Sequence, residues 1–180
     1  MGRKITSLLI CLAVTASVLC SCGNVLESWA YIHDPQTEIL SLSDNGKAVY
    51  KGSNYKYTKD DSFITLKDSS GGETKLRYVT DGDNIILYES STYDFDGEGE
   101  PNGVIGVWVQ DNGWSFQFTE KGTFAEENIF HGHYIVDENA HTIKLAYEEP
   151  MEDALLYYSL DGKKLTIEYP WPMVRTDSGK

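Results

Sequence analysis

The chain has 180 residues, of which 41% are hydrophobic, 24% charged and 12% aromatic, a composition typical of a globular protein and not of a disordered one. Its formal net charge of −13 argues against binding to nucleic acid, because contacts with a phosphate backbone require clustered Lys and Arg. The same charge repels anionic lipid headgroups, so any attachment to a membrane must depend on something other than charge.

The N-terminus has the layout of a secretory signal peptide. A short positive region at Arg3 and Lys4 precedes an apolar run from Ile5 to Leu19, which is too short to predict a transmembrane helix. All cysteines of the chain lie at or before Cys22, so removal of residues 1–21 would leave one thiol and no possibility of an intrachain disulfide.

The segment Leu19-Cys20-Ser21-Cys22 resembles the lipobox of bacterial lipoproteins, in which an aliphatic residue and two small residues precede the cysteine that receives the lipid. Cys22 fits this pattern better than Cys20, because Ser21 is the small residue expected before the cleaved bond. The resemblance implies lipid attachment at Cys22, a lipidated tether over 22–26, and an exported protein held at the extracytoplasmic face of a cell membrane. More than one acyl chain would make that anchoring stable.

The remainder of the chain contains an internal repeat. Equivalent residues lie 76 to 80 positions apart, with small loop insertions to explain the drift. The matched pairs are Trp29 and Trp108, Leu40 and Phe116, Leu42 and Phe118, Gly46 and Gly122, Tyr55 and Tyr134, Ile64 and Ile143, Leu66 and Leu145, Leu76 and Leu156, Tyr78 and Tyr158, Asp81 and Asp161, Gly82 and Gly162, and Leu87 and Ile167.

Both copies alternate apolar and polar residues with period two, which predicts β-strands. In chain order the clearest strands are 39–42, 63–66, 85–88, 114–118, 142–145 and 165–168. Turn residues such as Asp81-Gly82 and Asp161-Gly162 separate them and predict tight hairpins. Only residues 149–154 suggest a helical turn. A meander of short strands must curl or pack sheet on sheet to protect its edges.

Each copy also resembles the lipocalin-like domains of secreted bacterial lipoproteins. The second copy carries the clearer match, in Gly106-Val107-Trp108, in 116–124, in Gly132-His133-Tyr134 and in 158–167. The resemblance implies an all-β fold of two tandem small antiparallel meander barrels; one larger barrel formed by both repeats is the alternative. The expected boundaries are 27–90 for the first repeat, 91–103 for an acidic linker, 104–172 for the second repeat and 173–180 for a tail.

Two patterns suggest metal ligands. Asp94, Asp96, Glu98 and Glu100 alternate like the start of a calcium loop, but the twelfth position holds Ile105 and the context is β. His131 and His133 share one side of a strand and would need a third ligand such as His141 to hold zinc or copper. We therefore predict no metal site and no cofactor.

The sequence lacks the motifs of nucleophilic, phosphate-binding and zinc-dependent enzymes, so we predict a non-enzymatic protein. Rings at Trp108, Trp114, Phe116, Phe118 and Tyr134 could line a pocket, although most are expected in the core. Trp171, between Pro170 and Pro172, is expected to lie beyond the last strand as an exposed contact or a cap.

Two functions remain open at this stage. The first is a binding module for a small apolar or glycan ligand at the cell envelope. The second is a structural module that docks an envelope protein partner, with filled barrels and no small-molecule ligand.

Overall fold

A computed structural model describes residues 23–176, which form an antiparallel all-β fold without a helix. The strands are β1 (Val25–Tyr31), β2 (Glu38–Ser43), β3 (Lys47–Tyr50), β4 (Ser53–Lys59), β5 (Phe63–Lys67), β6 (Glu73–Asp81), β7 (Asn84–Phe95), β8 (Gly106–Val109), β9 (Ser115–Phe118), β10 (Thr123–Glu126), β11 (Phe130–Asp137), β12 (Thr142–Tyr147), β13 (Ala154–Asp161) and β14 (Lys164–Arg175). Within this part of the chain no helix could cross a membrane. The lipid-attachment residue predicted from the sequence, Cys22, and the predicted signal peptide lie outside the described residues.

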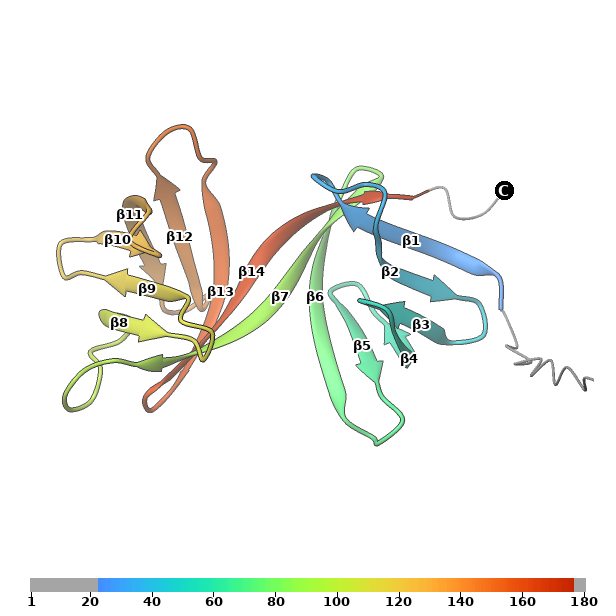
Figure 1. Cartoon of the computed structure of the whole chain (residues 1–180), viewed down its shortest axis with the longest axis horizontal. Helices are drawn as coiled ribbons and strands as arrows, with labels where there is room; N and C mark the ends of the chain where they lie inside the picture. Colours follow the sequence, from blue (N-terminus) through green and yellow to red (C-terminus); the bar gives the residue numbers. More distant parts are fainter. Residues whose placement is uncertain (1–22, 177–180) are drawn as a thin grey trace, which may run out of the picture.

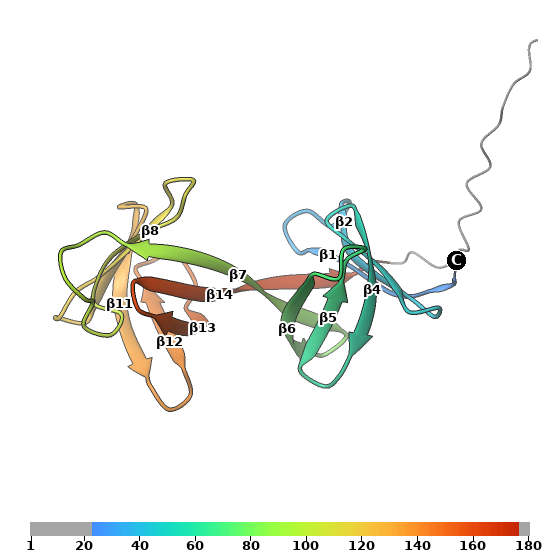
Figure 2. The ribbon, with the colours of Figure 1, turned by 90° about the horizontal axis from the view of Figure 1, so that it is seen from below.

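The strands join into one ring-like sheet whose two opposite sides meet in the middle. Every strand pairs with the next in sequence, and β1 closes the ring on β14. The two longest strands, β7 and β14, also pair with each other, from Ile85 opposite Met173 to Asp94 opposite Lys164. We call this pair the ribbon. It divides the molecule into two lobes that lie side by side, as Figures 1 and 2 show.

Each lobe takes one end of both ribbon strands. The first lobe consists of β1–β6 with the start of β7, which pairs with β6, and the end of β14, which pairs with β1. The second lobe consists of β8–β13 with the end of β7, which pairs with β8, and the start of β14, which pairs with β13. Neither lobe closes without residues from both strands of the ribbon.

Each lobe has its own hydrophobic core, and the two cores share no residue. The first is mostly aliphatic, with side chains such as Leu40, Ile64 and Leu87, whereas the second combines aliphatic side chains with aromatic ones such as Trp108 and Phe116; the side chains named here are inaccessible to solvent. Burial of one such side chain stabilises a fold by about 1.5–3 kcal/mol, which makes these alternating apolar positions the main source of each lobe's stability. Each lobe therefore buries a core of its own side chains in its interior.

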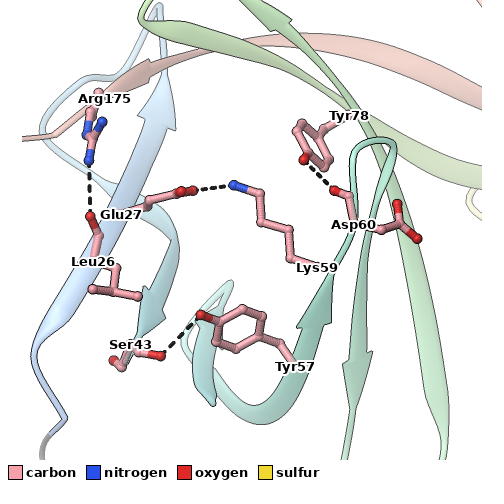
Figure 3. Close-up of polar contacts among 8 residues, drawn as sticks. All are labelled: Leu26, Glu27, Ser43, Tyr57, Lys59, Asp60, Tyr78 and Arg175. Carbon is pink, nitrogen blue, oxygen red and sulfur yellow. Dashed lines mark hydrogen bonds and ion pairs between the residues drawn. The ribbon is translucent and has the colours of Figure 1, made fainter. Parts of the chain in front are cut away.

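Polar contacts close one end of the first lobe (Figure 3). Lys59 of β4 reaches across to Glu27 of β1, with 2.6 Å between Nζ and Oε2, although these two strands are not neighbours in the sheet. Arg175 donates to the carbonyl of Leu26 at 3.0 Å, and the Tyr78 hydroxyl donates to the carbonyl of Asp60 at 2.5 Å. Of these contacts, the Lys59–Glu27 ion pair holds β1 against the opposite wall of the lobe.

The two lobes place a tyrosine at matching points. The hydroxyl of Tyr57 donates to the carbonyl of Ser43 at 3.1 Å, and that of Tyr134 donates to the carbonyl of Thr119 at 2.9 Å. Both bonds run from the fourth strand of a lobe to the end of its second strand. Tyr57, rather than the predicted Tyr55, therefore has the contacts of Tyr134.

The predicted strands are present at 39–42, 63–66, 85–88, 142–145 and 165–168, and the strand predicted at 114–118 begins one residue later. The Asp81-Gly82 and Asp161-Gly162 turns form two-residue hairpins, in which Asp81 pairs with Asn84 and Asp161 with Lys164. Both glycines have a positive φ, which accounts for glycine at this turn position.

Three local predictions were wrong. The acidic linker does not begin at residue 91, because β7 continues to Phe95 and the ribbon, rather than a loop, joins the lobes. Residues 149–150 form a turn and no helix. Trp171 has a sheet partner, Leu87, and β14 runs through both neighbouring prolines and on to Arg175, so Met173 belongs to the first lobe rather than to a tail.

Candidate functional site

An open cleft of about 730 Å³ lies between the two lobes, along the middle of the ribbon. The first lobe lines it with Tyr50, Lys51 and Lys75, and the second lobe with Trp114 and Glu126. Clefts of this volume accommodate small ligands. Because residues of both lobes line the cleft, it is formed only when the whole ring has folded.

The ribbon supplies the floor of the cleft. Glu89 of β7 and Tyr169 of β14 are direct partners in the sheet, and both line the cleft. Trp171 lies two residues beyond Tyr169 and therefore projects from the same face of the strand. The rings of Tyr169 and Trp171 pack with their centroids 5.6 Å apart.

Glu89 is the centre of a polar cluster on the side of the first lobe. Its Oε1 accepts hydrogen bonds from the hydroxyls of Tyr31 at 2.7 Å and Tyr50 at 2.9 Å, and its Oε2 lies 2.7 Å from Nζ of Lys51. Burial, and then the adjacent Glu89, raise the pKa of both tyrosines, so they remain neutral donors. The charge of Glu89 is thus compensated within the protein.

Glu126 is a second carboxylate of the cleft, in a different environment. Its residue is only 7% exposed, and its oxygens accept hydrogen bonds from the Tyr147 hydroxyl at 2.6 Å and from Nε1 of Trp114 at 3.2 Å. Among residues 23–176 no Lys, Arg or His forms an ion pair with it. Burial raises the pKa of Glu126, although the two hydrogen bonds oppose that shift.

A hydrogen-bond chain connects Glu126 to the ribbon. The Tyr147 hydroxyl, which donates to Glu126, lies 3.3 Å from the hydroxyl of Tyr169. Because Tyr147 gives its only proton to the carboxylate, Tyr169 is the donor in the second bond. The chain fixes the position of the Glu126 carboxylate relative to the floor of the cleft.

The five aromatic residues considered as pocket candidates lie in different places. Trp108, Phe116 and Phe118 are buried in the second core, and Tyr134 packs against that core. Trp114 alone of the five lines the cleft, with 41% of its surface exposed. Trp171, predicted from the sequence as an exposed contact, also lines the cleft.

The residues considered as metal ligands are not brought together. His131 and His133 are exposed on β11, whereas His141 lies in the turn before β12, next to the ring of Tyr158. Asp94 forms an exposed ion pair with Lys164, 2.6 Å between Oδ1 and Nζ. Residues 23–176 contain no group of three or more side chains placed to hold a metal ion.

Sequence reasoning missed Tyr50, Glu89, Glu126 and Tyr147. None of them belongs to a motif, and nothing in the sequence distinguishes the two glutamates from the rest of the chain's 28 aspartates and glutamates. Comparison with protein-family models, with curated proteins and with solved structures finds no match to this chain.

Proposed function

We propose that this protein is a binding module of the cell envelope that holds a glycan in the cleft between its lobes. The observation that carries the proposal is the composition of the cleft. Aromatic rings of Trp114, Tyr169 and Trp171 line the cleft together with side chains that donate and accept hydrogen bonds, whereas the interior of each lobe holds its own hydrophobic core. The cleft between the lobes therefore offers the room for a ligand.

A glycan suits this lining better than a purely apolar ligand does. A lipid would cover Ser90, Gln110 and Asn112 without replacing their hydrogen bonds to water, which costs free energy for each group left unpaired. A sugar ring offers an apolar C–H face to Trp114 or Trp171 and hydroxyls to the polar side chains. The same lining therefore satisfies both surfaces of a sugar.

Binding without catalysis is part of the proposal. Glycoside hydrolysis requires two carboxyl groups that both face the scissile bond. The oxygens of Glu89 are engaged by Tyr31, Tyr50 and Lys51, and both oxygens of Glu126 accept hydrogen bonds from the protein. Neither carboxylate has an oxygen without a protein partner.

Replacement of Trp114 by alanine tests the site. A stacked aromatic contact contributes about 0.5–1.5 kcal/mol beyond the area it buries, so Trp114→Ala is expected to weaken glycan binding up to about tenfold. A glycan array would identify the ligand, and titration calorimetry would compare the variants. Ile135→Ala is the matched control, because Ile135 is 70% exposed and lies outside the cleft.

A wild-type protein that binds no glycan on the array would contradict the proposal. That result would favour the alternative function, a docking module for an envelope protein. The hydrophobic cores inside both lobes are compatible with that alternative as well, but it gives no role to the cleft.

We further propose that the chain is an exported lipoprotein anchored through Cys22, on the strength of its N-terminal sequence. Cys22→Ala removes the thiol that would carry the lipid. The variant is expected to leave the membrane fraction or to keep its signal peptide, which fractionation and blotting would detect as a change in location or mobility. Unchanged retention with unchanged mobility would contradict the assignment.

We infer that the two lobes are repeats, each a small lipocalin-like barrel, that arose from one unit. Glu89 and Tyr169 occupy equivalent positions at a spacing of 80 and pair directly with each other. Antiparallel pairing of equivalent strands is the arrangement that a two-fold rotation between the lobes would produce. An experimental structure in which no rotation superposes the lobes would overturn this inference.

A further inference from the structure

The end of the cleft at the second lobe has a carboxylate that its surroundings do not neutralise. Glu126 is more than nine-tenths buried and lines the cleft, yet its two hydrogen bonds come from neutral groups, Tyr147 and Trp114. A carboxylate removed from water in this way is energetically costly, and a cation is the partner that lowers the cost most. The other carboxylate of the cleft, Glu89, already has Lys51.

Aromatic rings line the same cleft as Glu126. They belong to Tyr93, Trp114, Phe130 and Tyr169. The faces of such rings attract an ammonium group, an effect of about 0.5–1 kcal/mol at exposed sites and about 2 kcal/mol or more where water is excluded. A carboxylate in a cleft lined by aromatic rings is a combination that favours positively charged groups.

The opposite end of the cleft has the opposite character. Lys51 and Lys75 both line it; Lys51 is paired with Glu89, and the ammonium of Lys75 lies over the ring of Phe63 at 3.9 Å. The cleft therefore presents the ammonium of Lys75 at the first lobe and an unneutralised carboxylate at the second.

We propose that Glu126 and the aromatic rings of the cleft bind a positively charged amino group, so that the cleft prefers glycans with free amines over their N-acetylated forms. This inference rests on the proposed glycan-binding function and names the class of glycan. The competing explanation is that Glu126 serves only as a hydrogen-bond acceptor that holds Trp114 and Tyr147 in place.

A pair of probes that differ only in charge separates these explanations. The probes are the β-1,4-linked tetramer of N-acetylglucosamine and its fully deacetylated counterpart, titrated calorimetrically at pH 6.5. The wild-type protein is expected to bind the deacetylated tetramer about tenfold more tightly. Glu126→Gln removes the charge; its amide oxygen can still accept from Nε1 of Trp114, while its amide nitrogen can donate to the Tyr147 hydroxyl. It is expected to abolish the preference, so that the variant binds the two tetramers equally.

Glu138→Gln is the matched control, because it changes the net charge equally at an exposed position outside the cleft. It is expected to keep the preference. Equal binding of the two tetramers by the wild-type protein would overturn this inference and leave the proposed function standing, a result that does not depend on how the variant folds. Failure of the wild-type protein to bind either tetramer would also overturn the inference. If the glycan array were empty too, the proposed function would fall with it.

Discussion

A chain that ends after Pro170 is expected to lose the folded structure of its first lobe. The deletion removes Met173, a buried member of the first core, and the pairing of Met173–Arg175 with Trp29–Tyr31 of β1. Truncation of a buried Met to Ala costs about 2–5 kcal/mol, and the deletion removes a strand end as well. Since domains of this size are stable by only about 5–15 kcal/mol, the first lobe should open.

Hydrogen exchange resolved by segment is the measurement that checks this prediction. The amides of β1 and β2 are expected to lose protection, while those of β11 and β12 keep more of theirs, because β13 still pairs with the part of β14 that remains. A chain that ends after Thr176 retains every contact named above and serves as the control. Full protection of β1 in the shorter chain would show that the ring does not depend on its closure by β14.

Replacement of Trp108 by alanine is expected to destabilise the protein by about 3–5 kcal/mol. The Trp108 side chain is inaccessible to solvent, its ring packs 5.2 Å from that of Phe95, and its Nε1 donates to the carbonyl of Val104 at 2.7 Å. The substitution removes the buried side chain, its ring contact with Phe95 and its hydrogen bond to Val104 at once. Denaturation by urea, followed by circular dichroism, would measure the loss.

A comparison with Trp29 isolates the hydrogen bond. Trp29 is also buried, but its Nε1 has no partner among the described residues. Trp108→Phe leaves the Val104 carbonyl without its donor, whereas Trp29→Phe removes a donor that was unsatisfied. We therefore expect Trp108→Phe to cost about 1–3 kcal/mol more than Trp29→Phe. Equal costs would mean that the hydrogen bond contributes nothing measurable.

Much of the fold could be predicted because its signals are local. Alternation of apolar residues identified strands such as 63–66, and Asp-Gly identified the hairpins after β6 and β13. The extent of β14 could not be predicted in this way, since Pro170 and Pro172 usually end a strand. They are tolerated here because β14 pairs with β13 only as far as Glu168 and with β1 only from Met173. Between Glu168 and Met173, one edge of β14 is paired with neither β13 nor β1. The missing backbone N–H groups of the two prolines therefore interrupt no pairing with these strands.

The cleft could not be predicted, because its residues meet only after the ring closes. Glu89 receives hydrogen bonds from β1 and β3, and Glu126 receives them from β12 and from the residue before β9. No spacing in the sequence indicates those partners. Trp171 was the exception: prolines on both sides made it conspicuous, although its place in the sheet was not foreseen.

The ribbon of β7 and β14 also determines the order in which the two lobes can fold during translation. The second lobe is nested within the chain of the first, so its strand pairs and core residues have been synthesised once Tyr169 has been added. The first lobe was started earlier, at β1, but its last strand contact arrives only with Arg175. The half of the protein that begins first is therefore the half that is completed last, and until then its β1 edge has no β14 partner and is exposed to pairing with other chains.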